Sequence, residues 1–444
     1  MIAGAVQSLR LTIPFHNPPA VAPRPIPPIR RPLRDVRARV PASKSVANRE
    51  LVLSALADGR STVELGPLDP GDDVRAMRRT LAALGHDVRL ERGGKVVVRP
   101  SAAAEWPPEA RVDCGEAGTV ARFGLALAAT RGGAVRVDGG ERLRERPLEP
   151  LVRALRALGA TVEGDRLPLV VRGPARGGQV TVPGDRSSQF ASALLLIAPR
   201  LPDGLRLRVA GALVSAPYVE LTVAALRERG VRVERPSPAE FDVRPRRVRA
   251  RAVRVPGDAS AATYPAAAAA ILGGGVTILD VDARRRTGGQ GDVRAFDLLA
   301  RMGCRVDRGG SGVTVRREGT LYGIREEVMD CSDAFPTLAV VAACATTPTE
   351  LTGIGHTRRQ ESDRIAAVAD GLRALGGDVT AYADAIRIQP APLHGGVVDA
   401  RGDHRVAMAF SVLGLHVPGV AIEGWESVTK TFPGFYDMLS DLAK

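Results

Sequence analysis

The stretch L-A-A-L-G-H-D-V, residues 81–88, recurs in similar form four more times along this chain of 444 residues. Each copy is the end of a helix-like segment, then a glycine, then the start of a valine-rich strand. Glycine suits this place because the residue after a helix often takes a left-handed backbone conformation. Successive glycines are 71 to 74 residues apart, which predicts a repeated structural unit; they are Gly85, Gly159, Gly230, Gly303 and Gly376.

A second recurring feature is a strand end that turns tightly into a helix. Ser, Asp and Gly, which such helix starts favour, are common in these turns. Because the first N–H groups of a helix are free to bind anions, each turn is a potential anion site, and six converging turns would bind a strongly charged ligand. The turns read P-A-S-K-S, D-C-G-E-A-G-T, P-G-D-R-S-S-Q, P-G-D-A-S-A-A, D-C-S-D-A-F and D-A-R-G-D-H-R and begin at Pro41, Asp113, Pro183, Pro256, Asp330 and Asp399.

Six units of about 70 residues nearly fill the chain, so we expect an α/β fold built from them. The sixth unit lacks a closing strand because the sequence stops at Lys444. We expect residues 36–40 to supply that strand and close the array. The proline-rich residues 17–33 are expected to form an extended arm without a function of its own.

The chain carries a net charge of +13, and only four of its 62 basic residues are lysines. Such an excess of positive charge attracts anions of several kinds. Nucleic-acid-binding surfaces concentrate charge and commonly add stacking aromatic residues. Here arginine is dispersed, and the denser cluster at residues 244–254 contains no aromatic residue. We therefore expect small anionic metabolites as ligands, and no nucleic acid.

The cysteines form no C-x-x-C pair and have no metal-like spacing with the six histidines, so we expect buried thiols and no metal site. No apolar run is long enough to span a bilayer. The first residues lack the basic-then-apolar order of a signal peptide. The expected location is a reducing cytoplasm, with no membrane partner. The cysteines are Cys114, Cys304, Cys331 and Cys344.

The turns and the segments between them carry ten motifs in a characteristic order. They are P-A-S-K-S-V-A-N-R, C-G-E-A-G-T-V-A-R, E-R-L-R-E-R-P, S-S-Q-F, L-V-S-A-P-Y, G-D-A-S-A-A, S-D-A-F-P-T, Q-E-S-D-R, G-D-H-R-V-A-M and T-K-T-F-P. With them, about residues 30 to 440 resemble the 5-enolpyruvylshikimate-3-phosphate (EPSP) synthase family. The sister family that uses UDP-N-acetylglucosamine is disfavoured for two reasons. That family has Asn where this chain has Ser45, and it commonly has a reactive Cys in a loop, whereas Cys114 here lies in a helix-start turn.

The resemblance implies two similar domains, each made of three βαβαββ-type units, in the arrangement called the enolpyruvyl transferase inside-out α/β barrel. The expected division is an arm at residues 1–33, a first domain at 34–42 plus 256–444, and a second domain at 43–255. The active site is expected in the cleft between the two domains.

The implied reaction transfers the enolpyruvyl (carboxyvinyl) group of phosphoenolpyruvate to the 5-hydroxyl of shikimate 3-phosphate by addition and elimination. The products are EPSP and phosphate, in the shikimate pathway to chorismate and the aromatic amino acids. The resemblance implies no metal or cofactor, inhibition by glyphosate, and a monomer.

The resemblance also assigns roles to residues. Asp333 is the implied base beside the 5-hydroxyl, and Glu361 and Lys44 are the implied proton donors to C3 of phosphoenolpyruvate. The residues implied for shikimate 3-phosphate are Lys44, Ser45, Arg49, Ser187, Ser188, Gln189, Ser215, Tyr218, Asp333, His356 and Gln360. The residues implied for phosphoenolpyruvate are Lys44, Gly118, Arg142, Gln189, Arg364, Arg405 and Lys430. Arg122 is similar in register, with either a binding or a structural role.

Three positions depart from the family pattern. Ala42 replaces a glycine in the first turn, Gln360 stands where the family has a lysine, and His356 replaces a common asparagine. Two further functions therefore stay open: a specialised carboxyvinyl transferase acting on another cyclic alcohol, and a catalytically weak, ligand-binding paralogue. If shikimate 3-phosphate is the acceptor, Gln360→Lys is expected to hold or raise kcat/KM, by roughly tenfold.

Overall fold

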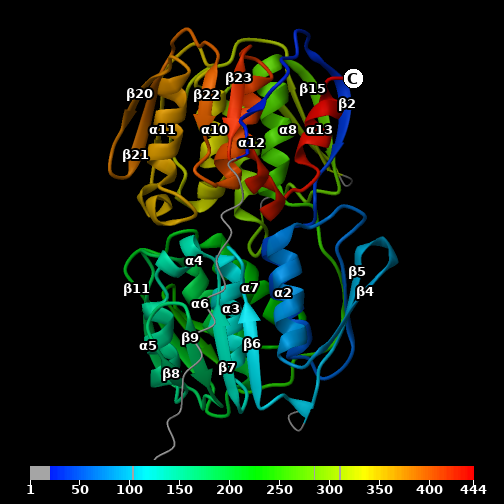
Figure 1. Ribbon diagram of the computed structural model, residues 1–444, viewed down its shortest axis with the longest axis vertical. Coiled ribbons are helices and arrows are strands. Elements are labelled where there is room, and N and C mark those ends of the chain that lie inside the picture. The colour runs from blue at the N-terminus through cyan, green and yellow to red at the C-terminus, as the bar shows by residue number, and fades with distance from the viewer. Residues whose placement is uncertain (1–20, 103–104, 285, 310–311) are drawn as a thin grey trace, which may run out of the picture.

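The computed structural model describes residues 21–102, 105–284, 286–309 and 312–444 and has two lobes along its long axis (Figure 1). Each lobe has its own hydrophobic core. The upper core draws on residues between 26 and 40 and between 259 and 442, and the lower core on residues between 42 and 255. The domain boundaries stay a prediction. The first 20 residues, with the expected absence of a signal peptide there, lie outside the described residues.

The lower lobe contains three β-α-β-α-β-β units, as the family resemblance implied. In each, the first two strands are parallel and the remaining pairings antiparallel. One unit comprises β14 (Ala252–Arg254), α1 (Lys44–Ala55), β3 (Ser61–Glu64), α2 (Asp72–Ala83), β4 (Asp87–Glu91) and β5 (Lys95–Arg99). The next comprises β6 (Glu109–Asp113), α3 (Gly118–Ala128), β7 (Ala134–Asp138), α5 (Glu149–Ala157), β8 (Thr161–Glu163) and β9 (Leu169–Arg172), with a short α4 (Glu141–Glu145). The third comprises β10 (Gly178–Pro183), α6 (Ser188–Ile197), β11 (Leu205–Ala210), α7 (Pro217–Glu228), β12 (Val233–Ser237) and β13 (Glu240–Val243).

The upper lobe repeats the plan. Its first unit comprises β2 (Leu33–Arg39), α8 (Ala259–Leu272), β15 (Gly274–Leu279), α9 (Arg294–Arg301), β16 (Arg305–Gly309) and β17 (Gly312–Arg317). The next comprises β18 (Arg325–Glu327), α10 (Phe335–Ala342), β19 (Thr349–Thr352), α11 (Arg364–Ala374), β20 (Asp378–Ala381) and β21 (Ala385–Gln389). The last comprises β22 (Gly396–Asp399), α12 (His404–Gly414), β23 (Val420–Glu423) and α13 (Phe435–Leu442), with β1 (Arg24–Pro25). Short 3-10 turns η5 (Met329–Ala334), η6 (Gly355–Arg359) and η7 (Trp425–Lys430) lie near the cleft.

The strand predicted to close the sixth unit is found elsewhere. Residues 33–39 form β2, which runs parallel to β15, whereas the sixth sheet has the order β1-β23-β22. The prediction that residues 36–40 close the sixth unit is therefore wrong. Leu33, Ala38 and Val40 are buried in the same core as Val276 and Ile278 of β15, with which β2 pairs in parallel.

The two chain crossings between the lobes lie side by side. Ala42 and Gly257 form an antiparallel bridge, and the N–H groups of Ser43 and Asp258 donate to the carbonyls of Pro256 and Pro41, both at 2.8 Å. Ala42 has no positive φ, so alanine fits this turn without backbone strain.

Three helices in each lobe occupy the interior and direct their first turns toward the cleft. Every residue of α3 and of α12 is buried, which is typical of a helix surrounded by other elements. The six predicted helix starts are confirmed, since α1, α3, α6, α8, α10 and α12 each follow one of the turns. The five predicted helix-ending glycines are also confirmed, with φ between 80° and 106°.

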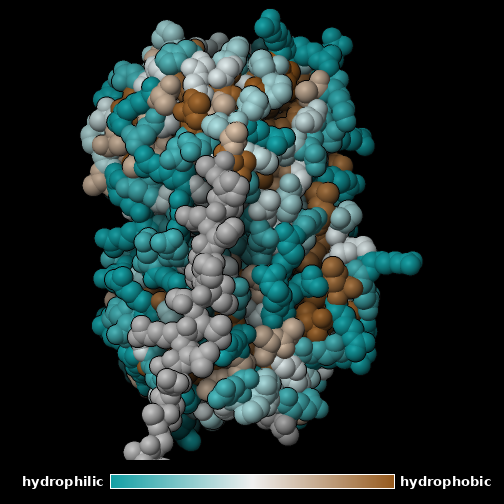
Figure 2. All heavy atoms as spheres, viewed as in Figure 1, coloured by the Kyte–Doolittle hydropathy of each residue, from teal (hydrophilic) through white to brown (hydrophobic). Residues whose placement is uncertain are grey.

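The described part of the proline-rich arm packs on the upper lobe. Ile26 is 4% exposed within the core, and the Arg24 guanidinium lies 4.7 Å from the Trp425 ring centroid and 4.1 Å from that of Tyr436. The face shown in Figure 2 is mostly hydrophilic. Within the described ranges, no helix is both long and apolar enough to cross a bilayer.

Candidate active site

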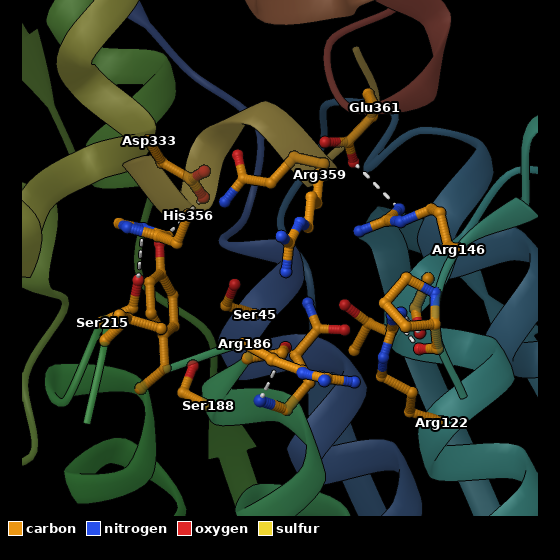
Figure 3. A pocket seen from close by; sticks show the side chains of 18 of the residues that line it. Ser45, Arg122, Arg146, Arg186, Ser188, Ser215, Asp333, His356, Arg359 and Glu361 are labelled. Carbon is orange, nitrogen blue, oxygen red and sulfur yellow. Dashed lines mark hydrogen bonds and ion pairs between the residues drawn. The ribbon is translucent and has the colours of Figure 1, made fainter. Parts of the chain in front are cut away.

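A pocket lies between the lobes where the first turns of the inner helices meet (Figure 3). It contains all but two of the residues that the sequence singled out. Arg142 and Lys430 line an adjoining pocket, which shares Asp73, Arg146 and Glu361 with the first. The predicted residues in the main pocket are Lys44, Ser45, Arg49, Gly118, Ser187, Ser188, Gln189, Ser215, Tyr218, Asp333, His356, Gln360, Glu361, Arg364 and Arg405.

Arg364 is the centre of an ion-pair network in the upper wall. Its side chain is 1% exposed and donates to Asp403 at 2.8 Å, to Asp333 at 2.9 Å and to Glu361 at 2.8 Å. Arg405 donates to the second oxygen of Asp333 at 2.6 Å. A buried arginine of this kind costs little only when several acceptors surround it. The network therefore fixes the positions of two carboxylates at the pocket wall.

The charge state of Asp333 follows from these contacts. Burial alone raises the pKa of the carboxyl, but the guanidiniums of Arg405 and Arg364 outweigh burial and hold the pKa below its ordinary value. The Tyr218 hydroxyl also donates to Asp333, at 3.1 Å. Asp333 is thus an ionised carboxylate that faces the pocket, which is the state that a general base requires.

Glu361 joins the two lobes. Its carboxylate lies 3.5 Å from Arg146 of the lower lobe and 3.6 Å from the Lys430 ammonium, besides its contact with Arg364. Burial raises the pKa of Glu361, but Arg146, Arg364 and Lys430 together lower it well below the ordinary value. The carboxylate is therefore ionised while no other anion competes for these cations.

Asp73, at the start of α2, holds the two lysines of the site. The Lys44 ammonium contacts its carboxylate at 2.7 Å, and the Lys430 ammonium lies 3.9 Å from the other oxygen. Lys430 also donates to the carbonyl of Glu116 at 2.5 Å. Both ammonium groups are consequently placed close together at the boundary of the two pockets.

The serine-lined wall holds hydroxyl donors near the start of α6. Ser187 caps this helix by accepting from the Gln189 N–H at 3.2 Å. Ser215 has φ of +52°, a left-handed conformation that is uncommon outside glycine and is often found at functional sites. Its hydroxyl lies 3.3 Å from that of Ser332, which in turn lies 2.9 Å from Nε2 of His356. Burial lowers the pKa of His356, so this imidazole is neutral.

Arg49 and Gln189, both predicted to bind substrate, differ in how many of their hydrogen-bonding groups already have protein partners. Arg49 donates to Thr222, to the carbonyls of Ser45 and Tyr218, and to Ser192, so only one of its five N–H groups has no partner among the described residues. By contrast, the buried Oε1 of Gln189 has no partner there. Arg49 therefore has at most one N–H to offer the acceptor, whereas the Gln189 amide oxygen is free to accept from a ligand.

Gly118 begins α3 at a place with no room for a side chain. A Cβ atom would lie 2.6 Å from Nη1 of Arg122 and 2.7 Å from Nη1 of Arg146. Arg122 is 2% exposed and donates to the carbonyls of Gly118 and Pro147, which makes it a structural residue. The glycine therefore lets two guanidiniums lie over the helix start.

Sequence reasoning missed several residues that the structure places at or beside the site, among them Arg146, Asp73 and Asp292. Arg146 lies in the quoted motif E-R-L-R-E-R-P, but that motif directed attention to Arg142 instead. Asp73 and Asp292 belong to none of the quoted motifs. Asp292 is 1% exposed and lies 3.3 Å from the Tyr218 hydroxyl. Burial and the nearby Asp333 carboxylate raise the pKa of Asp292.

The four cysteines carry no thiolate that could act as a nucleophile at the site. Cys114 is buried, and burial followed by the charges of Asp113 and Asp138 raises the pKa of its thiol to about 12. Cys304 and Cys331 are also buried, as the sequence predicted, while Cys344 is half-buried. Among the described residues, no group of three or more His, Cys, Asp or Glu side chains is arranged to hold a metal ion.

Comparisons with known proteins identify the family of this chain. The sequence profile of the EPSP synthase (3-phosphoshikimate 1-carboxyvinyltransferase) family matches residues 30–439. The 3-phosphoshikimate 1-carboxyvinyltransferase of Methanosphaerula palustris is 42% identical over 412 residues, which cover 91% of this chain and 96% of that protein. The enzyme of the same name from Methanoculleus marisnigri is 40% identical, with the same two coverages of 91% and 96%.

Two solved structures share the fold. EPSP synthase from Acinetobacter baumannii superposes with a TM-score of 0.76 at 26% identity, covering 94% of this chain and 97% of that one. An enolpyruvyl transferase from Streptomyces tendae superposes with a TM-score of 0.70 at 20% identity, covering 95% and 98%, and it supports the fold alone. The chain belongs to the EPSP synthase family of 3-phosphoshikimate 1-carboxyvinyltransferases.

Proposed function

We propose that this protein transfers the carboxyvinyl group of phosphoenolpyruvate to the 5-hydroxyl of shikimate 3-phosphate, releasing phosphate. The observation that carries the proposal is an ionised carboxylate, Asp333, in a pocket that collects cations from both lobes. Both substrates are anionic, so they need that charge. The acceptor hydroxyl needs a base.

The acceptor binds along the serine-lined wall. Ser187, Ser188 and Ser215 donate to its phosphate, and Ser45 with the remaining N–H of Arg49 holds its carboxylate. Its 5-hydroxyl then faces Asp333, which the Tyr218 hydroxyl and two guanidiniums orient. Support for this placement comes from the common pocket that these side chains line.

Phosphoenolpyruvate binds beside Gly118, among the cations that hold Glu361. Its carboxylate and phosphate replace Glu361 as partners of Arg146, Arg364 and Lys430. Because these cations lower the pKa of Glu361, competition from the substrate raises that pKa and lets the carboxylate take up a proton. Arg142 and Arg405 complete the anion site.

The reaction follows from these positions. Asp333 removes the proton of the acceptor's 5-hydroxyl while the hydroxyl oxygen bonds to C2 of phosphoenolpyruvate. At the same time Glu361, or alternatively Lys44, delivers a proton to C3. In the second step C3 returns a proton to Glu361, the bond from C2 to the phosphate oxygen breaks, and Asp333 gives its proton to the leaving phosphate. Atoms and charges balance without another reactant.

Incubation of the purified protein with both substrates tests the proposal. We expect stoichiometric EPSP and phosphate, followed by mass spectrometry and 31P NMR. Asp333→Asn should keep the fold and lose most of the turnover, since removal of the base costs about 100-fold or more. Efficient turnover of another cyclic alcohol, with shikimate 3-phosphate left unused, would instead favour the specialised transferase. Binding without turnover would favour the paralogue.

Three finer features belong to the same proposal. We place the reaction in the cytoplasm and the protein in solution as a monomer. Glyphosate is expected to compete with phosphoenolpyruvate at the site beside Gly118, because it is a similar small anion. A sedimentation experiment and inhibition kinetics at several phosphoenolpyruvate concentrations would check the last two.

A further inference from the structure

Two guanidiniums in the pocket have no role in the scheme above. Arg186 precedes the serines at the start of α6 in the lower lobe, and Arg359 ends η6 in the upper lobe. We propose that these two arginines clamp the phosphate of the acceptor, one from each lobe, and that Arg359 supplies the cation that position 360 lacks. The inference rests on the proposed function, because it names further binding residues of that same site.

The two side chains differ from the other cations of the pocket in having no partner. Lys44 pairs with Asp73, Arg146 with Glu361, and Arg364 and Arg405 with Asp333. Arg49 and Arg122 donate to carbonyls. Within the part of the chain that the structure describes, Arg186 and Arg359 form neither an ion pair nor a hydrogen bond, although both are exposed and line the pocket.

The neighbour of Arg359 in sequence shows what a structural arginine does at this place. Arg358 pairs with Asp363 at 2.7 Å and donates to the carbonyls of Ala383 and Tyr382 at 3.0 and 2.6 Å. Arg359 instead extends from the upper lobe into the pocket, while Arg186 lies on the opposite wall near Ser188 (Figure 3). Like charges that face one pocket repel each other until an anion lies between them.

Gln360 cannot supply that charge. Its amide oxygen accepts from Nη1 of Arg364, so the side chain belongs to the ion-pair network of the upper wall. The Arg359 guanidinium, one position earlier, has no such hydrogen bond among the described residues. Arginine is also well suited to a phosphate, because its planar fork donates two parallel hydrogen bonds to the oxygens. In this proposal Arg359 therefore supplies the positive charge that Gln360 does not.

Binding measurements separate this role from a general charge effect. Calorimetry would compare shikimate 3-phosphate with shikimate, which lacks the phosphate, for Arg186→Gln, Arg359→Gln and the control Arg305→Gln. Arg305 is 77% exposed on β16 and pairs with Asp307, so it matches the loss of one charge outside the pocket. We expect each pocket variant to weaken shikimate 3-phosphate about 10-fold or more, and shikimate and the control less than 2-fold.

Kinetics provide a second readout. In Arg359→Gln, KM for shikimate 3-phosphate should rise far more than kcat falls, and KM for phosphoenolpyruvate should stay near the wild-type value. Adding Gln360→Lys to Arg359→Gln should restore much of the affinity, because the ammonium again faces the phosphate. Gln360→Lys alone should bring no gain in kcat/KM, because Arg359 already binds the phosphate and the substitution breaks the contact of Gln360 with Arg364. This expectation replaces the tenfold rise predicted from the sequence.

The outcomes separate a failure of the clamp from a failure of the proposed function. Wild-type affinity for shikimate 3-phosphate in both pocket variants, equal losses for shikimate, or a tenfold gain from Gln360→Lys alone would each overturn the clamp and leave the proposed function standing. A wild-type protein that neither binds shikimate 3-phosphate nor turns it over would overturn the proposed function, and the clamp with it.

Discussion

Substitution of Gly118 by alanine perturbs the phosphoenolpyruvate site at one defined point. The added Cβ would lie 2.6 Å from Nη1 of Arg122 and 2.7 Å from Nη1 of Arg146, where ordinary contact begins near 3.4 Å. Arg122 is held by two carbonyls at 2.9 and 3.1 Å and is 2% exposed, so it has little freedom to move. Among the described residues, the Arg146 guanidinium pairs with Glu361 alone, at 3.5 Å, so it is the group that shifts.

A shift of roughly 0.7 Å, from 2.7 Å to ordinary contact near 3.4 Å, is enough to spoil a charge-assisted hydrogen bond from Arg146 to the substrate. Such bonds contribute about 1.5–3 kcal/mol, so KM for phosphoenolpyruvate and the inhibition constant of glyphosate should each rise about 10- to 100-fold. KM for shikimate 3-phosphate should change less than 2-fold, because the serine-lined wall lies apart from Gly118. Stability should fall by about 1–3 kcal/mol, because a shift of Arg146 leaves the closer contact with the tightly held Arg122 unrelieved.

Steady-state kinetics with each substrate varied, glyphosate inhibition and thermal denaturation would measure these effects. Gly132→Ala is a suitable control, because a Cβ at Gly132 meets no atom within 4 Å. Unchanged KM for phosphoenolpyruvate and unchanged inhibition in Gly118→Ala, with the control also silent, would refute the view that Arg146 contacts this substrate. A rise in both KM values would refute the separation of the two subsites.

Three further predictions concern charge and movement. Lys44→Met and Glu361→Gln should each lower kcat at least about 100-fold while circular dichroism stays unchanged, as expected for groups that place charge and move protons; near-normal turnover would remove them from the chemistry. Shikimate 3-phosphate with glyphosate should reduce the radius of gyration in X-ray scattering, because anions draw together cations from both lobes; an unchanged radius with binding verified would contradict this closure. Asp292 has its pKa raised to about 7 by burial and by Asp333, so the folded protein holds a proton that the unfolded chain has already released at pH 5. This contribution to stability disappears as pH rises through about 7, and the Tm of Asp292→Asn relative to wild type should therefore increase from pH 5 to pH 8; a difference independent of pH would show that Asp292 is ionised throughout.

The sequence by itself determined the repeated unit. Gly85 and its four counterparts end helices because a left-handed residue is needed there, and that need is local. The helix starts were equally readable, since an N-cap such as Ser187 or Asp403 satisfies an N–H group only two or three residues away. Signals of this kind depend on backbone geometry over a few residues, so they can be recognised in one sequence without the structure.

Tertiary structure alone decided which segments meet. β2 pairs with β15 across more than 200 residues of chain, and the sequence prediction placed it in the wrong sheet, because every strand offers the same backbone hydrogen bonds. The same holds at the pocket, where Asp73 joins Lys44 to Lys430 and Arg146 reaches Glu361 from the other lobe. These contacts exist because two independently packed cores bring their helix starts together. Arg359 has no partner among the residues that the structure describes, while its neighbour Gln360 accepts from Arg364. Both facts depend on the tertiary arrangement, and no local pattern in the chain encodes them.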